Sequence, residues 1–186
     1  MSVTLTSIES TVRNLIDDNL KTFKDIFTYS TSPIFTLSES NPYSVSEAYV
    51  NSVVLSSGEW SYDNSSKVTL SHPDLTSGDT IEIDYSAYPN YSSTEIQSFI
   101  KASLVHISIN NYKDFIVADS IIYPEPNDKE INLIAAITSV LIDKPVKSYR
   151  LPDVTVTYAE TMTFQERIRA IISSYKRNSA GIFFVG

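Results

Sequence analysis

Acid–base or metal chemistry in this chain would depend on two histidines and 22 acidic residues, because it contains no cysteine. The missing thiol excludes a cysteine nucleophile, a disulfide framework and thiolate-ligated metals. His72 lies in the turn-like segment Ser71-His72-Pro73-Asp74, and we interpret it as a surface residue. His106 lies within a helical pattern between apolar neighbours, where a core or interface histidine is more common than a general base. Two histidines so far apart predict no multi-histidine metal centre.

The acidic residues also fail to define an active site. Asp17 and Asp18 are adjacent on a helical pattern, and adjacent helical residues point in different directions. We interpret them as solvated or interfacial. No pair of acids stands out as a glycosidase pair, and the sequence contains no nucleophile elbow, dinucleotide fingerprint, P-loop, zinc-protease or EF-hand pattern. We therefore predict no catalytic residue, no cofactor and no metal, and expect that the protein is not an enzyme.

Aromatic residues offer a second kind of chemistry, namely stacking on flat ligands. Twelve tyrosines accompany a single tryptophan, and Trp60, Tyr62 and Tyr85 fall in strand-like segments. Such rings stack on sugars or bases. Nucleic acid would call for interleaved basic residues, and only Lys67 lies nearby. Strand aromatics more often cover a sheet or pack at a protein interface, so a carbohydrate- or receptor-binding module is an alternative rather than the main hypothesis.

Composition limits the class of protein. The chain has 186 residues, 42% hydrophobic and 19% charged, which suits one domain or one domain with a small insert. No apolar run approaches the roughly 20 residues that cross a bilayer. The residues after Met1 do not read as a signal peptide, so we expect neither a membrane protein nor an exported one.

Charge is unevenly distributed along the chain. The net charge is −8, the wrong sign for a protein that grips phosphate backbones. Residues 1–92 hold 4 basic and 12 acidic side chains, whereas residues 143–186 hold 7 and 4. This polarity suits an assembly in which one end of a subunit meets the other end of its neighbour, although ordinary surface variation is the alternative.

Helical patterns occur in four proline-free windows. Three begin with a Ser/Thr-x-x-Glu capping box and one with a looser Asn-x-x-Glu cap. The predicted caps are Thr6 with Glu9, Ser92 with Glu95, Asn127 with Glu130, and Thr163 with Glu166. The apolar stripe of the first helix is expected at Ile8, Val12, Leu15, Ile16, Leu20, Phe23 and Phe27. The third helix, Ile131 to Ile142, is apolar almost all round, which is typical of a central buried helix.

The segment between the first two helices instead favours strands. It is rich in serine, β-branched and aromatic residues, with Ser-Gly and Asp-Asn turns between short runs. The predicted strands are Ile34–Leu37, Tyr49–Leu55, Glu59–Tyr62, Lys67–Leu70 and Thr80–Tyr85. A smaller strand signal, Val154–Tyr158, is expected to be an extended loop or hairpin.

Together these patterns predict an α+β fold. We expect a four-helix-bundle-like body made of residues 1–30 and 90–186, with a small antiparallel β module, residues 31–89, inserted between the first and second helices.

Three groups of residues are predicted to form interfaces. The first is the aromatic set Trp60, Tyr62 and Tyr85. The second is basic and comprises Arg167, Arg169, Lys176 and Arg177. The third is the apolar segment Ile182, Phe183, Phe184 and Val185, which is costly to leave in water and should dock on another surface, either its own core or a neighbour.

The order of these elements resembles the neck and head–tail connector proteins of tailed bacteriophages. The resemblance rests on the strand run Tyr49–Leu55, Trp60–Asp63, Lys67–Leu70 and Leu75–Tyr85, followed directly by the helix that opens Ser92-Ser-Thr-Glu95-Ile96. The segment Phe164-Gln-Glu166-Arg167-Ile168-Arg169 to Lys176-Arg177 is similar to the helical body of head–tail adaptors.

The resemblance implies a structural role in the virion. Such proteins form a ring of identical subunits, usually a dodecamer, that docks beneath the portal protein, extends the DNA channel and receives a tail or stopper protein. DNA would pass through the lumen without specific binding, and the subunit would be made in the host cytoplasm. The large β insert and the long predicted first helix leave a tail terminator or another neck component as alternatives.

Overall fold

The chain forms two compact units, which are described separately below. The computed structural model describes residues 2–142, 148–150, 155–157 and 162–179. Residues 1–17 and 93–186 form one unit, called here the helical unit, and residues 18–92 form the other, the β unit. The division falls at residues 17/18 and 92/93 because the first strand of the chain belongs to the β unit.

The helical unit is built around one buried helix. Its helices are α1 (Leu5–Ile16), α2 (Ser93–Ile109), α3 (Asp128–Leu141) and α4 (Phe164–Ser179). Every residue of α3 from Leu133 to Val140 is buried, as its all-round apolar pattern predicts. The other three helices all pack on α3.

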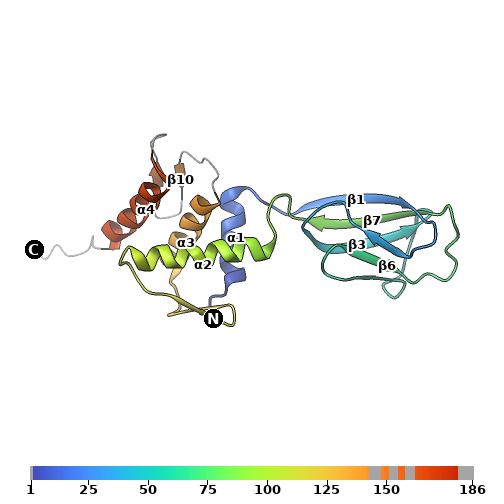
Figure 1. Ribbon diagram of the computed structural model, residues 1–186, viewed down its shortest axis with the longest axis horizontal. Helices are drawn as coiled ribbons and strands as arrows, with labels where there is room; N and C mark the ends of the chain where they lie inside the picture. The colour runs from blue at the N-terminus through green and yellow to red at the C-terminus, as the bar shows by residue number, and fades with distance from the viewer. Residues whose placement is uncertain (1, 143–147, 151–154, 158–161, 180–186) are drawn as a thin grey trace, which may run out of the picture. The chain divides into compact units, whose positions relative to one another are not determined.

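The prediction of a four-helix-bundle-like body is wrong. In such a bundle, nearly parallel helices each turn one apolar stripe toward a shared central core. Here α3 itself occupies the centre, and α1 runs across the direction of α2 (Figure 1). The unit also contains a hairpin of β8 (Ile116–Ala118) and β9 (Ile121–Tyr123), to which Thr4 adds a bridge at Ile121.

Capping residues fix where the helices begin. Asn127 and Glu130 form a reciprocal capping box on α3, and Thr163 exchanges hydrogen bonds with Glu166 on α4, so both predicted caps are confirmed. The Thr6–Glu9 cap is wrong. The cap of α1 is formed instead by Thr4 and Ser7, because the Glu9 side chain is bound to Arg13 inside the unit.

The first helix is also shorter than predicted. It ends at Ile16, after which Asp17 takes a left-handed conformation (φ 56°), and Lys21–Thr28 forms strand β1. The sequence pattern is ambiguous because Phe23 and Phe27, four residues apart, share a face in a helix and also in a strand. In β1 these rings turn inward, where Phe23 stacks on Tyr85 and Phe27 packs on Phe35.

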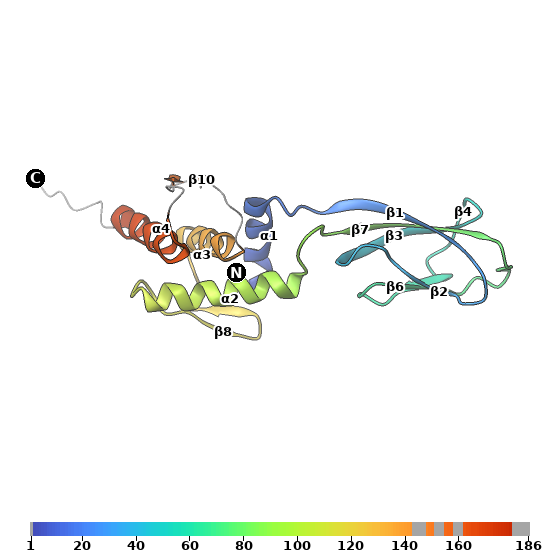
Figure 2. The ribbon, with the colours of Figure 1, turned by 45° about the horizontal axis from the view of Figure 1, so that its top comes forward.

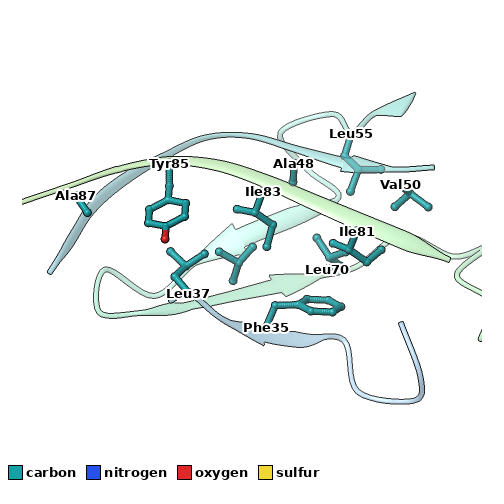
Figure 3. Close-up of a cluster of buried hydrophobic side chains, with 11 residues drawn as sticks. Phe35, Leu37, Ala48, Val50, Leu55, Leu70, Ile81, Ile83, Tyr85 and Ala87 are labelled. Atoms are coloured by element: carbon teal, nitrogen blue, oxygen red, sulfur yellow. The ribbon is translucent and has the colours of Figure 1, made fainter. Parts of the chain in front are cut away.

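Two antiparallel sheets make up the β unit. One has the strand order β1-β7-β3-β4 and the other β2-β6-β5. The remaining strands are β2 (Ile34–Thr36), β3 (Pro42–Val50), β4 (Val53–Val54), β5 (Trp60–Tyr62), β6 (Lys67–Leu70) and β7 (Thr80–Ala87). Figure 2 shows β2 and β6 in a layer apart from β1, β7 and β3. Apolar side chains from both sheets fill the space between them (Figure 3).

The β insert is therefore partly as predicted. Four predicted strands are confirmed near their expected bounds, and β6 begins and ends at the predicted residues. Tyr49–Leu55 is not one strand but a hairpin, in which Asn51 and Ser52 turn the chain with φ of 48° and 66°. The first half of β3 and all of β1 were not predicted. The late strand signal is confirmed at β11 (Thr155–Thr157), which pairs with β10 (Ser148–Arg150).

No helix within the described residues combines the length and apolar character needed to cross a membrane.

The two units should unfold independently, because each has its own buried core. Trp60 is the only tryptophan and lies in the β unit, whereas the four helices of the described residues lie in the helical unit. Substituting Ile83→Ala should lower the unfolding free energy reported by Trp60 fluorescence by about 2–5 kcal/mol and leave the circular dichroism transition at 222 nm in place.

Ile137→Ala in α3 is the matched control, since both isoleucines are fully buried. It should shift the helical transition and leave the Trp60 transition unchanged. Urea titrations followed by both signals provide the test, and a common shift in both signals for either variant would contradict independence.

The β unit should lose stability in acid. Hydrogen bonds from the backbone of Lys67 and from Ser65 hold the pKa of Asp63 at about 2, below its ordinary 3.8. Ser56 and then His72 hold the pKa of Glu59 at about 2, below its ordinary 4.5. A lowered folded-state pKa contributes stability that is present above the unfolded pKa and is lost as pH falls through the folded one.

The urea midpoint of the Trp60 transition should therefore fall between about pH 5 and pH 2. Asp63→Asn keeps a hydrogen-bond acceptor but cannot titrate, so its midpoint should fall less over this range. Asp74→Asn, at an exposed turn residue, is the charge-matched control. Identical pH profiles for wild type and Asp63→Asn would rule out this contribution.

Candidate interaction surfaces

The two histidines lie in different units and have different neighbours. His72 lies in the β unit with its Nδ1 2.7 Å from Glu59 Oε1. His106 lies on α2 of the helical unit, with its ring edge-on to Phe164 at 5.7 Å between centroids. Among the described residues, no three histidine or acidic side chains gather closely enough to hold a metal ion.

Asp17 is exposed, as expected, but Asp18 is a structural residue rather than a solvated one, which corrects that half of the interpretation. It is fully buried and accepts hydrogen bonds from both the backbone N–H and the side-chain amide of Asn90, each at 3.0 Å. Asp18 enters the β unit and Asn90 leaves it, so this contact ties together the two ends of the insert. No spacing in the sequence pairs residues so far apart.

The aromatic residues proposed for stacking serve mainly to hold the β unit together. Trp60 and Tyr62 alternate with exposed Ser61 on β5 and pack against the buried cluster of this unit. The Tyr62 hydroxyl donates to the Pro42 carbonyl at 3.0 Å. This packing occupies the inner side of Trp60 and Tyr62, and both side chains stay partly exposed.

Tyr85 is buried, and its ring has no open face. Its hydroxyl donates to Asp25 at 3.2 Å and accepts from the Glu39 backbone N–H at 3.3 Å. Ser38 completes the network through a 2.7 Å bond to the same carboxylate. Burial raises the pKa of Tyr85, so the phenol stays neutral and can donate. These bonds attach the segment after β2 to β1 and β7.

A buried ion pair in the helical unit was not predicted. Arg13 binds Glu9 through Nε at 2.9 Å and Nη2 at 2.8 Å, and both side chains are almost fully buried. The other carboxylate oxygen accepts from Gln97 of α2 at 3.1 Å. The i, i+4 spacing is visible in the sequence, but burial of the pair depends on α2 packing over it.

The predicted basic residues of α4 have different surroundings. Arg169 is exposed, Arg167 is half-buried, and Lys176 is exposed and donates to the Asn110 carbonyl just beyond α2. Arg177 lies in α4, but its side chain is outside the described residues. The apolar segment Ile182–Val185 also lies outside them.

Three exposed apolar side chains of the helical unit lie on α2 and α4. Val105 and Ile109, one turn apart on α2, are 57% and 68% exposed, and Phe164 at the start of α4 is 40% exposed. Beside them a cleft of about 230 Å³ separates the end of α2 from the start of α4. Clustered exposed apolar residues are typical of protein interfaces, whereas single ones are ordinary.

The β unit presents a different surface. It holds ten acidic and three basic residues, a net charge of −7, while the helical unit has twelve and eleven, a net charge of −1. On its outer sheet face, Lys24 Nζ lies 3.0 Å from Glu82 and 3.3 Å from Asp84, above the Tyr49 ring. Nearly all of the protein's net negative charge therefore belongs to the insert.

The chain matches no protein-family profile, and no curated protein matches it significantly. Its role has to be inferred from its own residues.

Trp60 gives a direct test of whether the β5 aromatics are core or platform. Trp60→Ala should destabilise the β unit by about 2 kcal/mol or more, because the indole packs on the buried cluster. Val53→Ala, at a 66% exposed site in the same unit, should change stability by less than about 0.5 kcal/mol. Amide hydrogen exchange measures both, and a Trp60→Ala variant as stable as Val53→Ala would favour a ligand platform.

Proposed function

We propose that this protein is a structural, non-enzymatic virion protein: a head-to-tail adaptor whose copies form a ring beneath the portal of a tailed bacteriophage. The ring would extend the DNA channel and join the capsid to a tail or stopper protein. Its site of action would be the neck of the particle.

The observation that carries this proposal is the grouping of exposed apolar side chains on the helical unit. Val105, Ile109 and Phe164 are each at least 40% exposed, and Ile109 lines the cleft between α2 and α4, so a second protein surface could bury them. A contact between two different patches on identical subunits generates rings when the rotation closes. Ring assembly is thus a direct use of a surface that the isolated subunit leaves in water.

Two further features support the adaptor role. The order of helix, β insert and three further helices agrees with the arrangement on which the resemblance to connector proteins rests. The net charge of −8 disfavours tight contacts with phosphates, so DNA could move through a channel lined by this protein without being trapped.

The alternative functions would use different surfaces or different partners. A tail terminator or another neck component would use the same ring surfaces with different partners. A carbohydrate-binding module would need open aromatic faces, and the inward packing of Trp60, Tyr62 and Tyr85 gives that role little support.

The proposal predicts assembly and location. The purified full chain should sediment as a closed ring, or remain a monomer that binds isolated portal rings, and antibody-labelled electron micrographs should place it at the particle neck. A protein that stays monomeric, ignores portal rings and shows sugar-dependent quenching of Trp60 fluorescence would instead be a binding module. Label on tail fibres or on the capsid faces would also overturn the proposal.

A further inference from the structure

The larger sheet of the β unit has two edges, and they differ in length. One edge is β4, which has only two residues, Val53 and Val54. The other is β1, whose eight residues pair with β7 on one side and with no described strand on the other (Figure 1). A short edge offers little to a neighbouring chain, whereas a long one carries a row of unpaired backbone donors and acceptors. The β1 edge is therefore the place where this sheet could be extended.

The backbone groups that face this edge can be identified from the strand pairing. The Tyr29 N–H donates to the Asp79 carbonyl at 2.8 Å, which continues the register of β1 with β7. Because the backbone groups alternate in direction along an antiparallel strand, every second residue before Tyr29 faces β7, and the others face outward. All members of this outward set also have exposed side chains, and they are Thr22, Lys24, Ile26 and Thr28.

The features that usually protect a long edge are weak in β1. The strand contains no proline, and its register with β7 runs without a bulge. Lys21 is only the first residue of the strand, and Lys24 turns back over the sheet, where its Nζ contacts Glu82 and Asp84 of β7. Ile26 is 65% exposed. The edge therefore combines outward backbone groups with an apolar side chain that is left in water.

The sheet face beside this edge is acidic. Glu47, Glu82 and Asp84 lie on the outer face, and Lys24 is the one basic residue on that face within the described strands β1, β7 and β3. A groove of about 350 Å³ lies on the same face, lined by Thr22 at the edge and by Lys24 and Asp84 further in. Because the β unit carries a net charge of −7, it attracts a basic partner and repels a second β unit.

We propose that the edge of β1 binds an extended, basic segment of a partner protein, which adds an antiparallel strand to the sheet. Backbone hydrogen bonds to the outward set supply affinity, and alternate side chains of the added strand lie on the outer face. An apolar residue opposite Ile26 covers its side chain, and an arginine opposite Thr22 lies over the groove beside Asp84. Lys24 favours a small neutral residue opposite it. This inference does not rest on the proposed function.

A peptide with this pattern provides the test. The probe is Arg-Thr-Ile-Thr-Ser-Thr-Arg with blocked ends, titrated into the isotope-labelled full chain and followed by NMR. The amide signals of the outward set should shift, and their hydrogen exchange should slow about tenfold or more, because the added strand takes up these N–H groups. The same peptide with glutamate in place of arginine should bind at least about tenfold more weakly. Equal binding of both peptides, or shifts confined to other residues, would overturn the proposal.

Methylation of the peptide backbone separates strand addition from simple charge attraction. N-methyl groups on the isoleucine and the serine, whose N–H groups would face β1, should abolish binding. N-methyl groups on two of the threonines, whose N–H groups would face away from β1, should change the affinity by no more than about twofold. An equal loss of binding in both methylated peptides would show that no strand is added.

Two substitutions at one position test the edge from the side of the protein. Ile26→Pro removes one outward N–H, and proline is tolerated on an edge strand where that N–H faces solvent. It should abolish peptide binding, whereas Ile26→Thr keeps the N–H and should weaken binding less than about tenfold. Urea unfolding followed by Trp60 fluorescence verifies that both variants keep the β unit.

The peptide-free chain identifies any other occupant of the edge. In the free chain, the outward amides should exchange much faster than those of the residues that face β7. Slow exchange of the outward amides at every protein concentration would mean that a segment of the same chain covers the edge. Slow exchange at high concentration alone would mean that a second copy does so. Either result would overturn the proposal of a partner protein.

Discussion

The antiparallel pairing of β1 with β7 is the constraint on which the rest of the molecule depends. The two strands run in register from Lys21 opposite Ala87 to Thr28 opposite Thr80. Because β1 enters the β unit and β7 leaves it, their pairing brings the two ends of a long insert side by side, where Asp18 binds Asn90. The chain can therefore leave after α1 and return at α2 while these two helices still pack on each other.

Buried polar contacts fix this arrangement at the places where apolar packing alone would allow alternatives. Glu9 and Arg13 join α1 to Gln97 of α2 in the helical unit. The Tyr85 hydroxyl and Asp25 attach the segment after β2 to the larger sheet. Each group is satisfied by its partners, and removing one partner would leave another buried and unpaired, which costs far more than the contact itself contributes.

The two units differ in what they offer a partner. The β unit carries almost all of the net negative charge, and it also exposes apolar side chains such as Ile26 and Val53. The helical unit is nearly neutral and leaves Val105 and Ile109 of α2 and Phe164 of α4 exposed. The negative charge of the β unit therefore opposes contact between two β units. The exposed apolar side chains of α2 and α4 instead provide area that association could bury.

Local sequence was sufficient wherever short-range physics decides the structure. The Asn127–Glu130 and Thr163–Glu166 caps, the buried helix α3 and the turns between short strands depend on neighbouring residues, and all could be predicted. Phe23 and Phe27 could not be assigned, because a four-residue spacing fits both periodicities and only pairing with β7 selects the strand. The same limit applies to the candidate site. The basic residues of α4 could be chosen from the sequence, but the cleft, the inward turn of Trp60 and the burial of Asp18 depend on residues that are distant in sequence, and these come together only when the chain folds.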